Sequence, residues 1–197
     1  IGPDLPVRMT IMGHPVDPPP PVVIMLHKPV GVVCSHKEAG RRIYDLLPPR
    51  WRVRDPALSS VGRLDKDTSG LLLITDDGGF LHRVISPKRH VPKSYIATLD
   101  RPLTGEEGAV FAAGTLMLES EEKPLLPAIL EPLSETKARL IIEEGRYHQV
   151  RRMFAAVGNH VVDLHRDRIG GLILPDDLEP GAHRVLPAAT AELVFAG

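Results

Sequence analysis

Residues 60–73 of this chain read SVGRLDKDTSGLLL, from Ser60 to Leu73. The segment places Asp65 and Asp67 directly before the apolar run 71–75, which we expect to be a buried strand. A loop anchored by such a strand can direct its polar side chains into a cleft. Because a neighbouring arginine favours the ionised form of a carboxylate, Asp65 is suited to act as a nucleophile. The alternative is a polar turn whose side chains only cap the strand.

A second candidate cluster lies on a predicted helix over residues 146–157. Its apolar residues are spaced as on one face of a helix: Val150, Met153, Phe154 and Val157. Arg151 flanks this apolar stripe, from where it can reach a cleft and pair with a carboxylate there. The alternative is that its side chain extends along the rim of the helix into solvent.

A third candidate is Tyr95, in the segment Lys93-Ser94-Tyr95 at the start of a predicted strand. The chain has only three tyrosines and 4% aromatic residues, so a tyrosine beside a basic segment is a candidate stacking platform for a nucleic-acid base. The alternative is a half-buried tyrosine that only packs against its neighbours.

The composition is that of one ordinary globular domain. The 197 residues are 43% hydrophobic and 25% charged, which excludes collagen, coiled-coil and wholly disordered chains. The longest apolar runs have four or five residues, whereas a membrane helix requires ~20. The single cysteine, Cys34, cannot form an internal disulfide, and the chain opens without an export signal. We therefore expect a cytoplasmic protein without a membrane partner.

Charge is unevenly distributed, although the formal net charge is only −1. Segment 82–93 carries cations and no acids, segment 146–168 carries five arginines and two aspartates, and segment 101–135 carries seven glutamates. The two basic blocks can form one face that contacts phosphate. The alternative is that solvated loops balance one another's charge. The expected surface contacts to phosphate are Lys88, Arg89, Arg166 and Arg168.

Predicted strands outnumber predicted helices, and hairpin-like turns are frequent. We expect helices over residues 80–85, 104–113 and 146–157, with a helical turn over 43–47. The expected strands are 22–26 with an extension over 30–34, 71–75, 94–99, 125–130, 137–143, 161–164, 171–174 and 191–195. This pattern predicts an α+β fold around a mixed, mainly antiparallel sheet with flanking helices. Residues 1–21 read as a linker with a run of prolines and a candidate strand over Val7–Ile11.

Three separated motifs of this chain resemble those of pseudouridine synthases. The central motif is Gly62-Arg63-Leu64-Asp65-x-x-Thr68-x-Gly70-Leu71-Leu72. His27-Lys28-Pro29-x-Gly31 stands upstream, and Glu144-Gly145-Arg146-Tyr147-His148-Gln149-Val150-Arg151-Arg152-Met153 stands downstream. This spelling, together with His165-Arg166-x-Arg168-Ile169-Gly170, is similar to the RsuA branch of the family, which modifies ribosomal RNA. The resemblance covers about Ile24 to about Leu186.

The resemblance implies a two-lobed antiparallel sheet with the active-site cleft between the lobes. Asp65 matches the family's essential aspartate, the nucleophile that isomerises a flipped-out uridine to pseudouridine. Tyr95 matches the aromatic residue that packs on the uracil, and Arg151 matches the basic residue that pairs with the aspartate. Arg63 matches a position associated with RNA engagement and base extrusion. The other expected substrate-binding residues are Lys93, Arg146, His148, Gln149 and Arg152.

The resemblance also implies the partners of the protein. The expected substrate is a specific uridine of ribosomal RNA, foremost small-subunit RNA, free or in a pre-ribosomal particle, and the expected enzyme is a monomer. The chemistry requires neither a metal nor a nucleotide cofactor, and the sequence has no standard Gly-rich phosphate loop and no zinc-ligand spacing. Members of this branch carry a small N-terminal RNA-binding domain, so residues 1–21 would be its remnant and linker, and residues 22–197 the catalytic domain.

Two other function classes fit parts of the sequence. Residues 65–69 are similar to the Asp-x-Asp-x-Thr loop of aspartyl-phosphate phosphatases, although the residues before them make a poor apolar strand. A phosphatase also needs a later acidic motif for magnesium, for which Asp76-Asp77 and Asp176-Asp177 are weak candidates. A non-catalytic RNA-binding module would use the two basic blocks alone and would not require Asp65.

Overall fold

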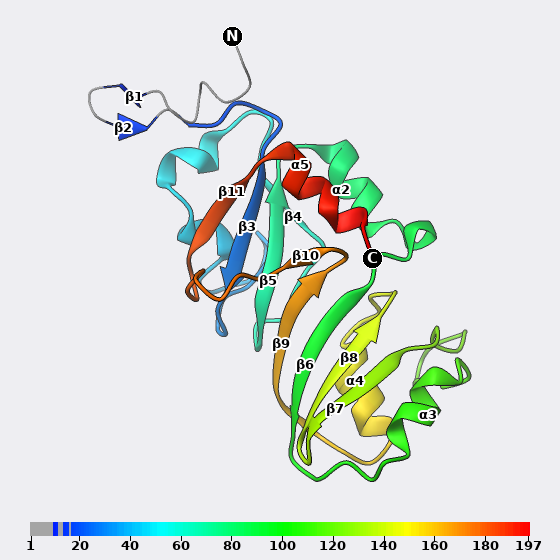
Figure 1. Cartoon of the computed structure of the whole chain (residues 1–197). Helices are drawn as coiled ribbons and strands as arrows, with labels where there is room; N and C mark the ends of the chain where they lie inside the picture. The colour runs from blue at the N-terminus through cyan, green and yellow to red at the C-terminus, as the bar shows by residue number, and fades with distance from the viewer. Residues whose placement is uncertain (1–9, 12–13, 16) are drawn as a thin grey trace.

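The computed structural model describes residues 10–11, 14–15 and 17–197 and is built on one open sheet of nine strands (Figure 1). The main path of this sheet is β11-β3-β5-β9-β6-β8-β7, with β4 beside β5 and β10 beside β9. Only the β5–β9 pair is parallel among the described pairs. The strands are β3 Val23–Lys28, β4 Ser59–Val61, β5 Thr68–Thr75, β6 Lys93–Leu99, β7 Ile129–Ser134, β8 Lys137–Ile142, β9 Val161–Ile169, β10 Leu172–Ile173 and β11 His183–Leu186.

The helices are short. The α-helices are α2 Gly78–Ile85, α3 Glu107–Ala112, α4 Gln149–Ala156 and α5 Ala188–Ala191, and 3₁₀ helices span Ile43–Leu46, Pro49–Val53, Pro87–Arg89 and Glu192–Phe195. Asp77 caps α2, because its carboxylate accepts hydrogen bonds from the N–H groups of Gly79 and Phe80. Before α3, the carboxylate of Glu107 accepts hydrogen bonds from both the backbone N–H and the hydroxyl of Thr104, which holds the turn that leads into the helix.

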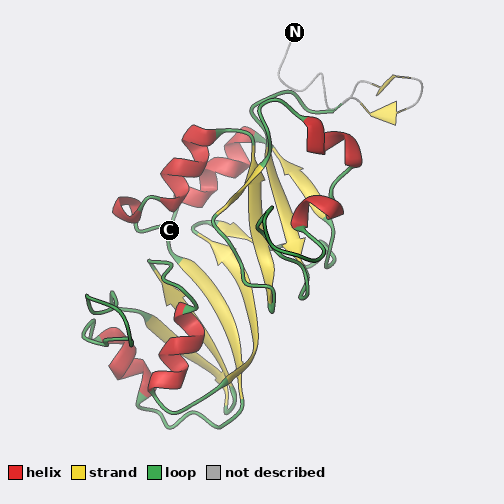
Figure 2. Ribbon diagram, turned by 180° about the vertical axis from the view of Figure 1, so that it is seen from behind, coloured by secondary structure: helices red, strands yellow, loops and turns green. Residues whose placement is uncertain are grey.

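Strand β5 separates two hydrophobic cores, because its successive side chains point to opposite faces of the sheet. Leu71 and Leu73 pack on one face in the core that includes α2 and α5, whereas Leu72 and Ile74 pack on the other face in the core that includes α3 and α4. One lobe contains β3, β4, β5 and β11, and the other contains β6, β7 and β8, with β9 running between them (Figures 1 and 2). The predicted α+β fold with a two-lobed, mainly antiparallel sheet is confirmed.

On the side away from β3, β5 has two different neighbours. Its first residues, Thr68–Gly70, pair with β9, and its last residues, Leu73–Thr75, pair with β4. The loop 62–67 connects β4 to β5 and therefore lies where these two neighbours diverge. This division of the sheet provides the space into which the loop can present side chains.

Gly70 allows β9 to approach β5 closely. Its backbone has a φ of +119°, and a Cβ atom placed on it would lie 2.1 Å from the carbonyl oxygen of Arg166. A side chain at this position would therefore push the two strands apart. This contact between strands explains why the central motif has glycine at position 70.

Three expectations about the elements are corrected by the structure. Residues 191–195 form the end of a helical segment rather than a strand, because Pro187 favours a helix start and the alanines that follow favour its continuation. Residues 30–34 form no strand beyond a single bridge at Val33, since Gly31 turns the chain with a φ of +92°. Strand β7 begins at Ile129, four residues later than the predicted start at 125.

The predicted strand Val7–Ile11 falls mostly outside the described residues. Its described part, Thr10–Ile11 (β1), pairs with His14–Pro15 (β2). Asp17 then joins the following segment to the body of the protein, since its carboxylate accepts hydrogen bonds from Arg50 at 2.7 Å and from the indole of Trp51 at 2.9 Å.

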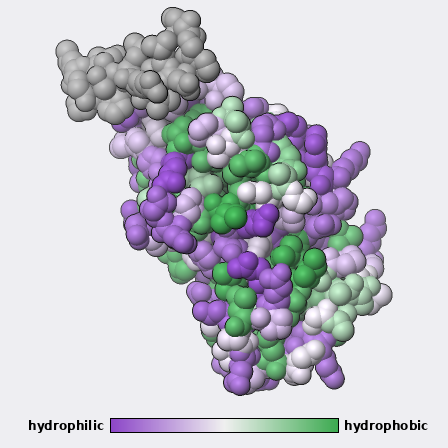
Figure 3. Space-filling model, viewed as in Figure 1, coloured by the Kyte–Doolittle hydropathy of each residue, from purple (hydrophilic) through white to green (hydrophobic). Residues whose placement is uncertain are grey.

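The surface mixes polar and apolar side chains. On the face shown in Figure 3, hydrophobic side chains are interspersed with hydrophilic ones over both lobes. Ile173 and Leu193 are among the exposed apolar residues. In the described part of the chain, no helix has the length and apolar character needed to cross a membrane.

Replacing Gly70 with alanine tests the contact between β5 and β9. We expect Gly70→Ala to lower the free energy of unfolding by about 2 kcal/mol or more, because the new methyl group overlaps the backbone of Arg166. Gly108→Ala in α3 is the matched control, since nothing lies within 4 Å of its Cβ position. Alanine there should raise the stability by about 0.5–1 kcal/mol. Urea unfolding measures both, and equal effects of the two changes would contradict the assigned contact.

Candidate active site

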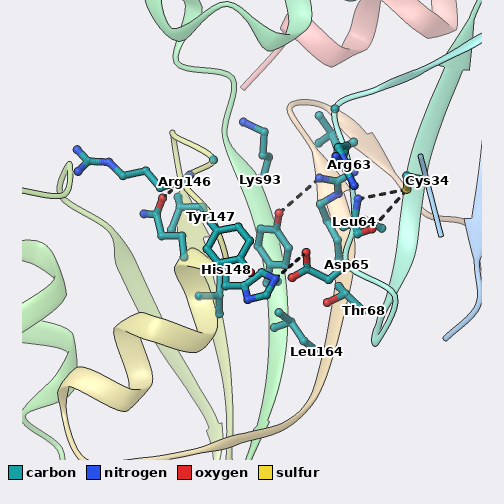
Figure 4. Close-up of a pocket in the computed structure, with 18 of the residues that line it drawn as sticks. Cys34, Arg63, Leu64, Asp65, Thr68, Lys93, Arg146, Tyr147, His148 and Leu164 are labelled. Atoms are coloured by element: carbon teal, nitrogen blue, oxygen red, sulfur yellow. Dashed lines mark hydrogen bonds and ion pairs between the residues drawn. The ribbon is translucent and has the colours of Figure 1, made fainter. Parts of the chain in front are cut away.

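A cleft of about 1310 Å³ lies between the two lobes. Loop 62–67 and segment 30–34 contribute one wall, and β6 with residues 142–151 contributes the other. Figure 4 shows the side chains of Asp65 and His148 pointing toward each other in this space. The expected site residues that line it are Arg63, Asp65, Lys93, Tyr95, Arg146, His148, Gln149 and Arg151. The structure thus brings together residues that are far apart in the sequence.

Lys28, the last residue of β3, fastens the loop that carries Asp65. Its side chain is 0% exposed, and its ammonium group donates hydrogen bonds to the carbonyl oxygens of Pro29 (2.9 Å), Lys66 (3.4 Å) and Thr68 (2.7 Å). Three acceptors match the three protons of a charged lysine. Burial lowers the pKa of Lys28, and the negative charge of nearby carboxylates such as Asp65 acts in the opposite direction.

Two further contacts hold the residues on either side of Asp65. The N–H of Gly31 donates to the carbonyl oxygen of Lys66 at 2.7 Å. The thiol of Cys34 lies 3.4 Å from the carbonyl oxygen of Leu64 and 3.5 Å from its nitrogen. Burial raises the pKa of the Cys34 thiol, so the group stays protonated and can donate to the carbonyl. Since both neighbours are held, the side chain of Asp65 is free to face the cleft.

Asp65 meets His148 across the cleft (Figure 4). The imidazole Nε2 lies 3.4 Å from Oδ1 of Asp65, and the two side chains are 40% and 37% exposed. His148 has a φ of +48°, a conformation that costs a non-glycine residue about 1–3 kcal/mol and is typical of functional sites. Its ring stacks on that of Tyr147 with centroids 3.8 Å apart. Sequence reasoning placed His148 among the substrate-binding residues and did not single out Tyr147.

Arg151 has a different carboxylate partner from the expected one. Its Nη2 lies 3.5 Å from Oδ2 of Asp67 and donates to the carbonyl oxygen of the same residue at 3.2 Å, while Nη1 donates to Val161 at 3.2 Å. The expected ion pair between Arg151 and Asp65 is not present among the described contacts, so this prediction is wrong. The start of β9 and the back of the loop hold the guanidinium, so Arg151 supports the loop two residues beyond Asp65.

Tyr95 forms the inner wall of the cleft and is 9% exposed. Its hydroxyl oxygen accepts a hydrogen bond from Nη1 of Arg166 at 3.4 Å, and the guanidinium carbon lies 5.9 Å from the centroid of the ring. Lys93, two residues earlier on the same strand, also lines the cleft. Burial and the charge of Arg166 lower the pKa of Lys93, while Glu144 raises it.

The expected surface position of Arg166 is wrong, because the residue is only 3% exposed. The pairing of β6 with β9 shifts register between Ser94 and Tyr95, so that Tyr95 pairs with Arg166, Ser94 pairs with Arg168, and Asp167 is skipped. Such a bulge re-aims side chains, and it places the two arginines on different faces of the sheet. Arg168 is exposed and lies beside Ser94, away from the cleft.

The remaining expected residues divide between the mouth of the cleft and its supports. Arg63 is exposed at the mouth and pairs with Glu38. Arg146 donates to Glu144 at 3.1 Å, and Gln149 donates to the same glutamate at 3.1 Å. Arg152 does not line the cleft; its guanidinium donates to Glu121, Tyr147 and Glu119 instead. Arg152 therefore supports the segment before α4 from behind.

Known proteins resemble this chain in sequence and in structure. Residues 22–156 match the family model described as RNA pseudouridylate synthase. This chain belongs to the RNA pseudouridylate synthase family. It is 48% identical over 169 residues to the ribosomal small subunit pseudouridine synthase A of Escherichia coli (strain K12), which covers 84% of this chain and 71% of that protein. The namesake from Vibrio cholerae is 49% identical over 166 residues, with the same two coverages.

Solved structures share the fold of this chain. A crystal structure of a pseudouridylate synthase matches with a TM-score of 0.82 and 45% identity, covering 88% of this chain and 74% of that one. The archaeal box H/ACA sRNP Nop10–Cbf5 complex matches with a TM-score of 0.55 and 18% identity over 80% of this chain and 50% of that one, which shows a shared fold alone.

The predicted resemblance to RsuA-type pseudouridine synthases is confirmed, and the chain is an RNA pseudouridine synthase. The phosphatase alternative is overturned by this family membership. In addition, the strand before the loop, β4, has three residues and is antiparallel to β5.

Lys28→Met tests the support of loop 62–67 in this pseudouridine synthase. Methionine fills the volume but removes a donor from the carbonyl groups of Pro29, Lys66 and Thr68, of which Lys66 keeps the Gly31 N–H, and each buried group left unsatisfied costs about 1–3 kcal/mol before relaxation. We expect turnover to fall by more than about tenfold, since a misplacement of about 1 Å is already costly. The control is Lys37→Met, on an exposed neighbouring position. A Lys28→Met enzyme as fast as this control would show that the ammonium does not position the loop.

Proposed function

We propose that this protein isomerises a specific uridine in small-subunit ribosomal RNA to pseudouridine, with Asp65 as the nucleophile. The observation that supports this proposal most is the placement of the Asp65 carboxylate, which faces the cleft from a loop fastened on both sides. The relatives named as ribosomal small subunit pseudouridine synthases support the choice of RNA. Such a substrate places the reaction in the cytoplasm.

The reaction exchanges one bond to the ribose for another. The bond between N1 of uracil and C1′ breaks, the base turns, and a bond between C5 and C1′ replaces it. The proton on C5 then leaves, and N1 ends with a proton, so the atoms balance without a redox step. In this proposal the ionised carboxylate of Asp65 supplies the electron pair that attacks an electrophilic carbon of the nucleoside.

The base must leave its stack to reach Asp65, at a cost of a few kcal/mol. Tyr95 is the proposed platform that restores stacking, since its ring forms the inner wall of the cleft. Its hydroxyl already accepts from Arg166, so the oxygen lies beside a cation. Only a phenolate oxygen can accept the proton from C5, and a neighbouring cation stabilises the negative charge that this oxygen carries before it accepts the proton. Arg63, exposed at the mouth, is the proposed residue for engaging RNA and displacing the base.

The other site residues have supporting roles in the proposal. Arg151 orients the loop through Asp67, and His148 holds the carboxylate of Asp65 until the base enters. Arg146 and Gln149 place Glu144 near Lys93, where these side chains can contact the nucleotide.

Asp65→Asn tests the proposed nucleophile and separates an enzyme from an RNA-binding module. The amide has the shape of the carboxylate but no charge, so we expect pseudouridine formation to fall below about a thousandth of the wild-type rate, while RNA affinity and the unfolding midpoint stay unchanged. The measurement is pseudouridine formed per enzyme in a single turnover, with Asp176→Asn, an exposed aspartate, as the control. Activity retained in Asp65→Asn would refute the nucleophile. Binding without turnover in the wild type would support the module.

The exposed cations Lys88 and Arg89 follow α2 beside the cleft and are the proposed phosphate contacts. Each contact to single-stranded RNA contributes about −0.7 to the slope of the logarithm of affinity against that of salt concentration. We expect the double change Lys88→Gln/Arg89→Gln to raise the apparent KM and to flatten this slope by about 1.4, with an unchanged rate at saturating RNA. A lower saturated rate with an unchanged slope would contradict the assignment.

A further inference from the structure

Arg166 is a buried cation without a carboxylate partner among the described ion pairs. The residue as a whole is only 3% exposed to solvent. Nε donates to the carbonyl oxygen of Leu71 at 2.9 Å, and Nη1 donates to the hydroxyl of Tyr95 at 3.4 Å. Nη2 is buried and has no hydrogen-bond partner within the described part of the chain. One donor and the full positive charge are therefore unmatched.

Keeping this unpaired charge buried lowers the free energy of unfolding of the protein. Removing an unpaired ion from water is strongly unfavourable, and both hydrogen-bond partners of the guanidinium, the Leu71 carbonyl and the Tyr95 hydroxyl, are neutral. The surrounding sheet is nevertheless shaped to hold it there. Gly70 lets β9 approach β5, and the register shift opposite Tyr95 turns Arg166 toward the cleft. An arrangement that lowers the stability of the fold in this way is expected at a functional site.

Lys93 adds a second cation to the same wall. It lines the cleft two residues from Tyr95, and its charge is close enough to that of Arg166 for the two to repel. Glu144, an acid whose charge acts on Lys93, is already engaged by Arg146 and Gln149. The inner wall of the cleft thus carries an excess of positive charge that an anionic group can neutralise.

The depth of these cations indicates which part of the substrate they meet. A phosphate of the RNA backbone is strongly hydrated and has exposed cations available at the mouth, where the side chain of Arg63 is 65% exposed. The inner wall beside Tyr95 faces the base instead. When the bond between N1 and C1′ breaks, its electron pair stays on the base, and uracil becomes an anion with charge spread over N1, O2 and O4.

We propose that Arg166, assisted by Lys93, is a catalytic residue that stabilises the negative charge on the detached uracil. The step balances: N1 keeps the electron pair of the broken bond while the carboxylate of Asp65 bonds to C1′, C5 then displaces that carboxylate and so neutralises the base, and the proton lost from C5 is matched by the proton gained at N1. This inference rests on the proposed function. It adds a role for Arg166 that is distinct from any effect on the hydroxyl of Tyr95.

Arg166→Gln is the direct test, because glutamine can keep a hydrogen bond to Leu71 while it removes the charge. We expect the single-turnover rate at saturating RNA to fall about a hundredfold, with RNA affinity within about threefold of wild type. The thermal midpoint should not fall, since an unpaired buried charge is removed. Arg166→Lys restores the charge and should recover at least about tenfold of the rate. The matched control is Arg184→Gln, an exposed arginine on β11, with an unchanged rate.

A more acidic base provides the specific readout. RNA with 5-fluorouridine at the target position carries an electron-withdrawing substituent that stabilises the uracil anion, so loss of the target nucleoside should depend less on Arg166. We expect the defect of Arg166→Gln to shrink about tenfold with this substrate. When both enzymes also carry Tyr95→Phe, Arg166→Gln should still lower the rate. If Arg166 acted only through the hydroxyl of Tyr95, the change would have no further effect in this background.

The outcomes separate this inference from the proposed function. If the wild-type enzyme forms no pseudouridine in the RNA, the proposed function fails. If the wild type is active and Arg166→Gln is as fast, or if its defect is equal for uridine and 5-fluorouridine, the role assigned to Arg166 is wrong. A loss of rate accompanied by a lower thermal midpoint in both Arg166→Gln and Arg166→Lys would show a structural role and would also overturn it.

Discussion

The buried ammonium group of Lys28 is the interaction on which the catalytic geometry depends. Lys28 ends a strand that lies between β11 and β5, and it pairs with Gly70 of β5, so its position is set by the pairing of the sheet. Burying a charge is costly, and three carbonyl groups of the loop region offset that cost only when the loop has its observed shape. The carboxylate of Asp65 therefore faces the cleft because hydrogen bonds already hold the backbone on either side of it.

The cations of this protein are separated by depth, and the separation follows from the sheet. Arg63, Lys88 and Arg89 lie on loops and a short 3₁₀ helix, where water screens them and phosphate can reach them. Arg166 lies on a strand that a bulge turns inward, where the same charge acts at low dielectric. One residue type can thus bind the RNA backbone at the mouth and act on the base at the inner wall.

The sequence predicts the parts of this structure that depend on local pattern. The apolar run 71–75 and the spacing of Val150 and Phe154 predict β5 and α4, and the motif around Asp65 predicts the cleft. The position of Arg166 could not be predicted in the same way, because a basic segment is ordinarily a solvated surface and the bulge depends on pairing between β6 and β9.

The partner of Arg151 shows a second limit of the sequence. Asp65 and Asp67 are two residues apart, and only the loop held by Lys28 determines which of them meets the guanidinium. Residues 191–195 show a third, since a short, mostly apolar segment fits a strand as well as a short helix when tertiary packing is unknown.

The most direct test of the account is to map pseudouridine in ribosomal RNA after incubation with the purified protein. Unmodified transcripts of the small- and large-subunit RNAs are treated separately, and the modified positions are read nucleotide by nucleotide. The account predicts a single new pseudouridine in the small-subunit RNA and none in the large-subunit RNA. Modification confined to the large-subunit RNA, or an absence of pseudouridine in both RNAs, would contradict it.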